Sequence, residues 1–155
     1  MEKDQVIRRA SRYEMPAPVY LTYNNTDSCT AEATAPWFNV LLDSTLSTTR
    51  YLSDHYTNVE FRVVGQVERN GHITRVSEFL LGNRIIVHST VDIPVADNPD
   101  RFIGIIREQN VPIGDALRDN GYRVEREILH HDASSKVYAM RGDVNLKITE
   151  QYYII

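Results

Sequence analysis

The stretch that decides the fold runs from Val59 to Ile93: VEFRVVGQVERNGHITRVSEFLLGNRIIVHSTVDI. Apolar and polar residues alternate at its start, as in a strand with one buried face. The Asn70–Gly71 pair is the strongest short signal for a β-hairpin, and Gly82–Asn83 marks a second turn. Strands joined by such short turns run antiparallel, because parallel strands need long crossover connections. The stretch therefore predicts a three-stranded antiparallel meander, with later strands over Ile73–Leu81 and Arg84–Ile93.

The C-terminal part of the chain carries the same strand pattern. Alternation predicts three further strands, over Tyr122–His130, Lys136–Arg141 and Asn145–Ile154. Together with the meander they give an antiparallel sheet of about six strands. Short helices are predicted before the meander and between its last strand and Tyr122. The predicted fold class is therefore α+β, with short helices packed on an antiparallel sheet.

The predicted helices begin at recognisable residues. Apolar residues recur every three to four positions after Pro36, and proline suits the first position of a helix. The Asn98–Pro99 pair is a typical helix start, because an asparagine side chain can cap the free N–H groups of the first turn. The predicted helix starts are Pro36, Ser44 or Thr45, Asn98, and Pro112, whose helix extends through Leu117.

The first 35 residues do not follow this pattern. Pro16 and Pro18 exclude a helix around them, and the alternation from Val19 to Tyr23 allows one short edge strand. We therefore predict an irregular N-terminal extension, residues 1–35, followed by a single domain, residues 36–155.

Composition argues against several classes of protein. The chain has 155 residues, with 17 Lys and Arg against 21 Asp and Glu, and this net charge of −4 disfavours a general nucleic-acid binder. No apolar run approaches the ~20 residues that span a membrane. The N-terminus lacks the apolar stretch of a secretory signal. We expect a cytoplasmic protein without nucleic-acid or membrane partners.

The sequence carries no metal or cofactor motif. Cys29 is the only cysteine, so the chain cannot form an intramolecular disulfide or a thiolate zinc site. The five histidines have no ligand spacing. The seven glycines are scattered at turns rather than gathered in a phosphate-binding loop. We therefore expect neither a metal nor a cofactor.

The last predicted strand carries a carboxylate on its apolar face. Glu150 alternates with Leu146, Ile148, Tyr152 and Ile154. Burying a carboxylate costs several kcal/mol unless it is paired or protonated. Two interpretations follow: Glu150 forms a structural ion pair with an arginine, or it is a functional acid that transfers protons near neutral pH.

Arginine is the second candidate for a functional side chain, because its guanidinium can hold both oxygens of a carboxylate. Arg75 shares a strand face with Ser77 and Phe79, and Arg126 shares an apolar face with Val124. Each of these arginines either binds a carboxylate ligand or extends along the apolar surface to reach solvent.

Four short motifs lie in order along the chain: Leu41–Arg50, Ser77–Leu81, Pro112–Leu117 and Ile148–Tyr152. In their order and spacing they resemble the chorismate lyase family, which removes pyruvate from chorismate to make 4-hydroxybenzoate. They correspond in turn to that family's Leu-Leu-x-x-Ser-x-Thr helix junction, its Arg-Glu-hydrophobic-Leu-Leu strand, its Pro-Leu-Gly motif before a short helix, and its terminal Thr-Glu strand. The resemblance covers Pro36 to Ile155.

The resemblance implies an antiparallel sheet whose ligand is enclosed beneath helical flaps. It implies that Glu150 lies in the pocket and takes part in the proton transfer that releases pyruvate. By the same resemblance, Thr45 or Leu46 belongs to a flap of the pocket. Ile113 and Gly114 would place backbone groups over the ligand.

The substrate-clamping residues depart from the family pattern. Ser77 occupies the position of the family's first clamping arginine. The position of the family's second clamping arginine is occupied by Ser89 or Thr90. Arg75 lies two residues before Ser77 on the same strand face, so we expect it to substitute as the clamp. Arg75 and Ser77 are therefore both predicted to contact the substrate.

These features together predict a chorismate-lyase-like enzyme that acts on a small aromatic or cyclic carboxylic acid in a buried pocket. The reaction is either pyruvate elimination from chorismate or a related reaction on an altered substrate in a specialised biosynthetic pathway. The alternative is a non-catalytic small-molecule-binding domain of the same fold, as in the effector domains of bacterial transcription regulators. In both cases the expected partner is a small-molecule carboxylate.

Overall fold

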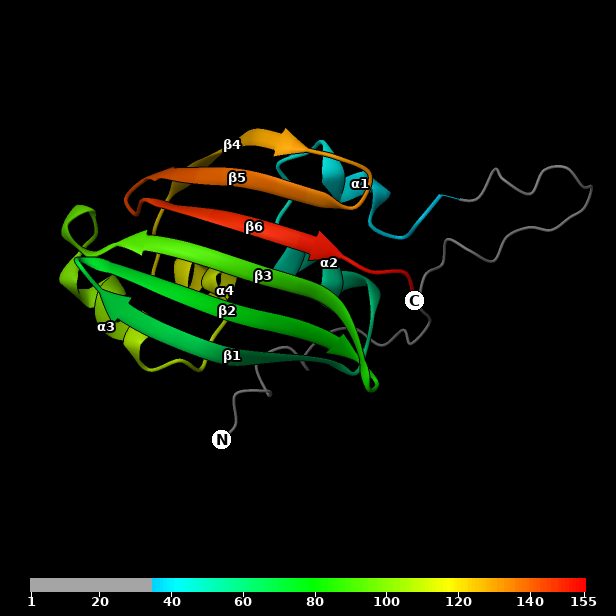
Figure 1. Ribbon diagram of the computed structural model, residues 1–155, viewed down its shortest axis with the longest axis horizontal. Helices are drawn as coiled ribbons and strands as arrows, with labels where there is room; N and C mark the ends of the chain where they lie inside the picture. Colours follow the sequence, from blue (N-terminus) through cyan, green and yellow to red (C-terminus); the bar gives the residue numbers. More distant parts are fainter. Residues whose placement is uncertain (1–34) are drawn as a thin grey trace, which may run out of the picture.

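The computed structural model describes residues 35–155, which form one six-stranded antiparallel sheet with short helices behind it (Figure 1). The strand order is β1-β2-β3-β6-β5-β4. The strands are β1 (Val59–Arg69), β2 (His72–Leu81), β3 (Arg84–Pro94), β4 (Val124–His131), β5 (Ser135–Gly142) and β6 (Leu146–Tyr152). The helices are α1 (Asn39–Leu42), α2 (Thr48–His55), the 3-10 turn η3 (Val95–Asp97), α3 (Asp100–Arg107) and α4 (Ile113–Asp119). The predicted α+β class with an antiparallel sheet is confirmed.

The β1–β2–β3 meander forms as the turn residues predict. Asn70 and Gly71 have φ angles of 53° and 80°, which is the left-handed pair that a tight two-residue hairpin requires. The C-terminal strand β6 pairs with β3 on one side and with β5 on the other, so it lies near the centre of the sheet. This central position buries one face of β6 and with it Glu150.

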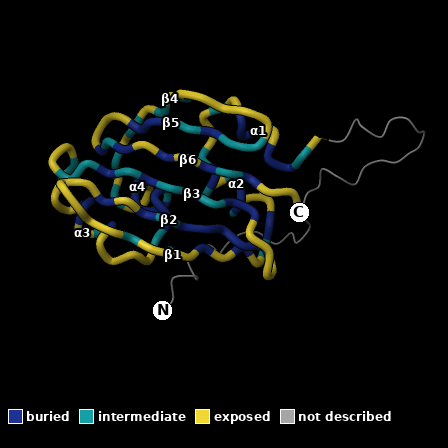
Figure 2. Tube along the Cα trace, in the orientation of Figure 1, coloured by how far each residue is buried: buried dark blue, intermediate teal, exposed yellow. Residues whose placement is uncertain are grey.

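Two apolar clusters hold the helices on the inner face of the sheet. Figure 2 shows buried residues along the middle strands and many exposed residues on β1, β4 and the turns. The first cluster joins α1 and α2 to the sheet through Leu41 and Leu52. The second cluster joins α3 and α4 to the sheet through Phe102 and Leu117. The core of the domain is therefore divided into two halves.

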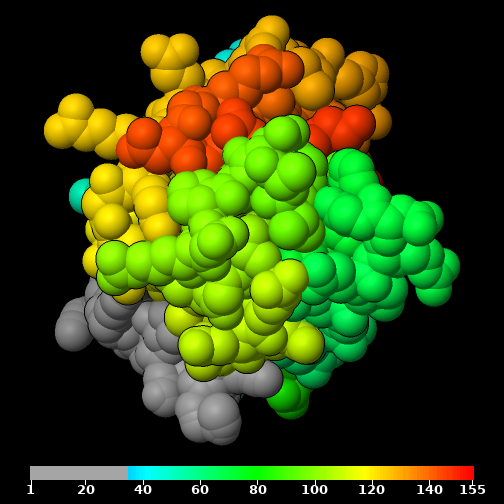
Figure 3. Space-filling view, turned by 90° about the vertical axis from the view of Figure 1, so that its left-hand side faces the viewer, coloured from blue at the N-terminus to red at the C-terminus, as the bar shows by residue number. Residues whose placement is uncertain are grey.

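An ion pair fixes α3 against the edge of the sheet. Arg107 at the end of α3 donates two hydrogen bonds to Glu68 of β1, at 2.9 and 2.7 Å. Figure 3 shows this end of the molecule, where the yellow-green region around α3 lies against the green β1–β2 hairpin. No helix within residues 35–155 is long and apolar enough to cross a membrane.

The predicted caps of the second helix are wrong. Ser47 caps α2, because its Oγ accepts a hydrogen bond from the Arg50 N–H at 3.2 Å. Ser44 is used elsewhere: its hydroxyl donates to the Val40 carbonyl and so closes the turn after α1. Thr45 and Leu46 consequently lie in the connection between the two helices. The first helix is also shorter than predicted and begins at Asn39.

The predicted cap of α3 is wrong as well. Pro99 precedes the first residue of α3, and no side chain caps this helix. The Asn98 side chain instead donates hydrogen bonds to the carbonyls of Pro94 and Asn145, at 2.7 and 2.9 Å, and accepts one from the Asn145 N–H at 2.6 Å. Asn98 therefore joins the end of β3 to the turn before β6.

Replacing Asn98 with alanine is expected to lower the free energy of unfolding by about 2 kcal/mol, because two carbonyls and one N–H lose their partner. Urea unfolding checks this value. Asn83→Ala is the control, since Asn83 is exposed in the β2–β3 turn and should change the stability by less than about 0.5 kcal/mol. Equal losses in both variants would contradict the role of Asn98.

The predicted N-terminal extension, apart from Ala35, lies outside the described residues. The same holds for the short strand predicted around Val19–Tyr23 and for Cys29.

Candidate functional site

A row of polar side chains crosses the inner face of the sheet between the two apolar clusters. Cα pairing places Ser77 of β2 opposite Ser89 of β3, Ser89 opposite Glu150 of β6, and Glu150 opposite Lys136 of β5. All four residues are buried. Burying polar groups in a core is unfavourable unless partners compensate for the loss of water. Such a row in a divided core therefore marks a candidate binding site.

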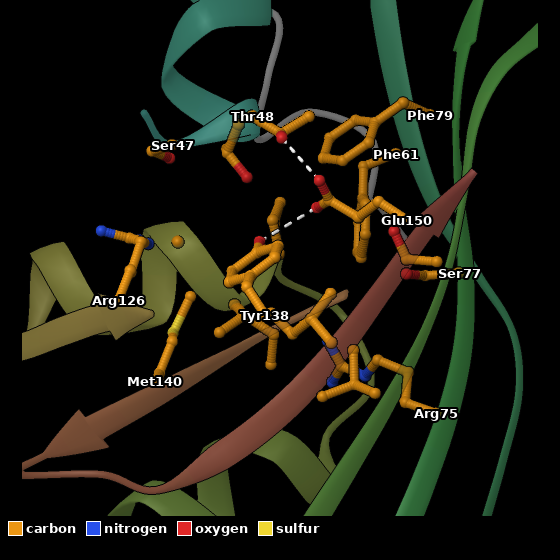
Figure 4. Close-up of a pocket in the computed structure, with 17 residues that line it drawn as sticks. Ser47, Thr48, Phe61, Arg75, Ser77, Phe79, Arg126, Tyr138, Met140 and Glu150 are labelled. Atoms are coloured by element: carbon orange, nitrogen blue, oxygen red, sulfur yellow. Dashed lines mark hydrogen bonds between the residues drawn. The ribbon is translucent and has the colours of Figure 1, made fainter. Parts of the chain in front are cut away.

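A cavity opens over this row, beneath the first turns of α2 and α4 (Figure 4). It contains about 410 Å³ of empty space including its mouth, but the centre of a water molecule reaches only about 30 Å³ of it. A ring-sized ligand therefore requires the covering segments to move apart. The cavity is lined by Ser47, Thr48, Thr49, Phe61, Arg75, Ser77, Phe79, Ser89, Val91, Pro112, Ile113, Gly114, Arg126, Tyr138, Met140, Ile148 and Glu150.

The Glu150 carboxylate is held by three hydroxyl groups from three different elements. Thr48 Oγ1 of α2 and the Tyr152 hydroxyl of β6 donate to Oε1, at 2.7 and 2.6 Å. The Tyr138 hydroxyl of β5 donates to Oε2 at 3.1 Å. No ion pair to Glu150 forms within residues 35–155. Hydroxyl donors thus satisfy this buried carboxylate in place of an arginine.

The two tyrosines remain hydrogen-bond donors over the physiological pH range. Burial raises the pKa of the Tyr138 hydroxyl well above its ordinary value, and the negative charge of Glu150 raises it further. The same two causes, burial first, raise the pKa of Tyr152. Both hydroxyls therefore keep their protons. They fix the carboxylate of Glu150 in one orientation toward the cavity.

Arg75 is fully buried and its partners are neutral. Nε donates to Gln66 Oε1 at 2.9 Å, Nη1 to the Val111 carbonyl at 2.7 Å, and Nη2 to the Ile106 carbonyl at 3.1 Å. Burial lowers the pKa of Arg75 to about 10, so the guanidinium stays charged at neutral pH. No carboxylate within residues 35–155 pairs with it. A buried guanidinium on a cavity wall, held only by neutral acceptors, is suited to bind an anionic ligand.

The structure brings together most of the predicted site residues. The cavity is lined by Glu150, Arg75, Ser77, Ile113 and Gly114.

Thr45 and Leu46 do not line this cavity. They line a neighbouring surface groove instead. The reason is the position of the cap: since α2 begins after Ser47, its first turn presents Ser47 to Thr49 to the cavity, and Thr45 and Leu46 stay outside. The residues of this segment that line the cavity therefore lie a few positions later in the chain than predicted.

Several residues of the site were not predicted. Tyr138 and Tyr152 fit the pattern of ordinary apolar core positions, and only their hydrogen bonds to Glu150 reveal their role. Thr48 was hidden by the wrong choice of helix cap. The place of Lys136 beside Glu150 follows from strand pairing, which the sequence does not specify.

Gly114 is the point at which α4 touches α2. A Cβ at Gly114 would lie 3.1 Å from Thr49 Oγ1, whereas a Cβ at Gly104 in α3 would meet nothing within 4 Å. Gly104→Ala is expected to raise the free energy of unfolding by about 0.5–1 kcal/mol through helix propensity. Gly114→Ala is expected to lower it by about 1 kcal/mol, because the helices must separate. Denaturant unfolding of both variants tests this, and a gain in both would contradict the close approach.

The described residues thus place a carboxylate, that of Glu150, and a guanidinium, that of Arg75, at one cavity. No group of three His, Cys, Asp or Glu side chains in this part of the chain is placed to hold a metal ion. Comparison of the chain with family models and with curated proteins finds no match.

Proposed function

We propose that the protein is a chorismate-lyase-like enzyme that acts on a small aromatic or cyclic carboxylic acid bound in this cavity. The observation that carries the proposal is that Glu150 and Arg75 line one and the same cavity. Arg75 holds the carboxylate of the substrate, since a guanidinium matches two carboxylate oxygens. Glu150 transfers a proton, as a carboxylate of fixed orientation can when it lies beside the reacting carbon.

The proposed reaction is an elimination that breaks a carbon–oxygen bond. Glu150 takes a proton from a ring carbon while the carbon–oxygen bond on the neighbouring carbon breaks, and the leaving group departs as an enolate. Glu150 then gives the proton to the enolate oxygen, which forms the enol and regenerates the carboxylate. In the pyruvate elimination implied by the resemblance, that enol becomes pyruvate and the ring becomes aromatic. Thr48, Tyr138 and Tyr152 position Glu150 and stabilise its negative charge before the proton is taken.

The identity of the clamp favours a substrate that differs from chorismate. Ser77 and Ser89 are neighbours in the polar row, and the resemblance places one family arginine at Ser77 and a second at Ser89 or Thr90. Arg75 lies in the next row, where it pairs with Gln66 and Val91 of the adjacent strands. The proposed carboxylate position is therefore shifted along β2 by two residues, and a related substrate of different shape fits it better.

Two assays test the proposed function. Purified protein is incubated with chorismate between pH 5 and pH 8, and pyruvate is measured. In parallel, thermal unfolding is followed with benzoate and 4-hydroxybenzoate, where a ligand at 100 times its Kd stabilises the fold by about 2.7 kcal/mol. We expect stabilisation by the aromatic acids. Absence of both pyruvate release and stabilisation would refute the proposal.

The alternative is a non-catalytic binding domain of the same fold. One observation favours it: three hydroxyl groups already donate hydrogen bonds to the Glu150 carboxylate. A glutamate with a purely structural role would be held by the same hydrogen bonds. The two functions differ in what happens to a bound acid. If an acid that stabilises the protein is recovered unchanged after prolonged incubation, and no acid in the tested series is converted, the binding domain is the better description.

A further inference from the structure

A second guanidinium faces the cavity from the side opposite to Arg75. Arg126 of β4 lines the cavity, and Figure 4 shows it across Tyr138 and Met140 from Arg75. Its Nε is buried and has no hydrogen-bond partner within residues 35–155. No carboxylate in that part of the chain forms an ion pair with it. A buried donor on a charged group is costly when it stays unpaired, so a ligand is its natural partner.

The charges around the cavity do not balance. Glu150 contributes one negative charge, and its cross-strand neighbour Lys136 contributes one positive charge. The Lys136 ammonium is occupied, because it donates to the Ser44 carbonyl at 3.1 Å and lies 4.9 Å from the centre of the Tyr138 ring. The guanidinium groups of Arg75 and Arg126 then remain without a counter-charge. This local excess is notable in a chain whose net charge is −4.

Arg126 has no ion-pair partner within residues 35–155, whereas two arginines beside it each pair with an aspartate. A surface groove adjoins the cavity and shares Ser47, Gly114 and Arg126 with it. Arg50 in this groove pairs with Asp54 at 3.5 Å, and Arg118 pairs with Asp115 at 2.9 Å. Their charges are neutralised within the protein. Arg126 stands unpaired where the groove meets the cavity.

The strand order places Glu150 on a strand that lies between the strands of the two arginines. Arg75 belongs to β2, Arg126 to β4, and Glu150 to β6, which lies between them in the sheet. Four strand spacings of about 4.8 Å separate β2 from β4. Both arginines line the cavity between these strands, so a ring admitted to the cavity would lie between them. A ligand bound at both ends would therefore cross β6, the strand that carries Glu150.

We propose that Arg126 is a second anion-binding residue of the cavity, and that the ligand is a small ring carrying two acidic groups, one at Arg75 and one at Arg126. The inference rests on the proposed function for the acid at Arg75. The second acidic group is a carboxylate or a phosphate-like group, because a guanidinium binds both in the same two-point manner.

The test compares ligands with one and two acidic groups by isothermal titration calorimetry. The probes are benzoate, benzene-1,4-dicarboxylate and 4-phosphonobenzoate, and the last two distinguish the two kinds of second group. We expect the wild-type protein to bind at least one of the doubly acidic probes about tenfold more tightly than benzoate. Arg126→Met should remove this preference and leave benzoate affinity unchanged. Arg126→Lys should restore part of it.

Arg123→Met is the matched control, since Arg123 lines only the groove and should keep the preference. Equal weakening of benzoate and of the doubly acidic probes by Arg126→Met would overturn the inference, because it would indicate a structural role. Equal affinity of the wild-type protein for all three probes would overturn it too. Failure of the proposed function gives a different result, in which Arg75→Met keeps full affinity for benzoate.

Discussion

Replacing Arg75 with methionine is expected to abolish binding of aromatic acids and to lower the free energy of unfolding by about 3 kcal/mol. Arg75 donates to the carbonyls of Val111 and Ile106 and to Gln66, and all three acceptors are left without this donor in the variant. Methionine fills much of the same volume, so the cavity it leaves is small. Urea unfolding measures the stability, and thermal shift with benzoate measures the binding.

Arg101→Met is the matched control for this prediction. Arg101 is an exposed arginine whose guanidinium also donates to a neutral acceptor, Asn120 Oδ1, at 3.0 Å. Its replacement should change the stability by less than about 0.5 kcal/mol and leave binding intact. Arg75→Lys separates charge from shape, because lysine keeps the charge and cannot make the three directed contacts. Full benzoate affinity in Arg75→Met would show that the carboxylate binds elsewhere.

Replacing Glu150 with glutamine is expected to lower turnover at least about 100-fold while the protein stays folded. Glutamine has the same shape as glutamate and keeps one oxygen for the Thr48 and Tyr152 hydroxyls. The Tyr138 hydroxyl can rotate to accept a hydrogen bond from the new amide. The free energy of unfolding should therefore fall by only about 1 kcal/mol. Steady-state kinetics on a converted substrate and thermal unfolding measure the two effects.

Glu60→Gln serves as the control, because Glu60 is exposed on β1 and does not line the cavity. It should change neither turnover nor stability. A loss of several kcal/mol in Glu150→Gln with turnover retained would assign Glu150 a structural role. That result would contradict the proposed proton transfer and leave the anion-binding prediction at Arg75 intact.

The sheet could be predicted because its signals are local. Asn70–Gly71 and Gly82–Asn83 set the two turns, and alternation sets which residues face inward. The pairing of β6 with β3 could not be predicted in this way, since it joins residues that lie some sixty positions apart in the chain. That pairing determines which polar side chains meet Glu150.

The helix caps were mispredicted because several residues compete for the same role. Ser44, Thr45 and Ser47 are all chemically able to cap α2, and the choice depends on where the chain leaves α1. Asn98 is a good cap that the fold uses for a different purpose. A shift of the α2 cap from Ser44 or Thr45 to Ser47 is small along the chain, yet it decides which side chains reach the cavity.

Glu150 and Arg75 were predicted because each is a charged residue on an otherwise apolar strand face. The neutral residues that complete the site gave no such signal. Tyr138 and Tyr152 are common in cores and on strands alike, and only the observed hydrogen bonds to Glu150 distinguish them. Charge on an apolar face is therefore the more informative pattern for locating a site of this kind.

A crystal structure of the protein with 4-hydroxybenzoate bound tests the central claim most directly. The claim predicts that the ligand carboxylate lies within hydrogen-bonding distance of the Arg75 guanidinium, with the ring in the cavity beside Glu150. It also predicts that the first turns of α2 and α4 have moved apart to admit the ring. A ligand bound outside this cavity, or one whose carboxylate points away from Arg75, would contradict the account.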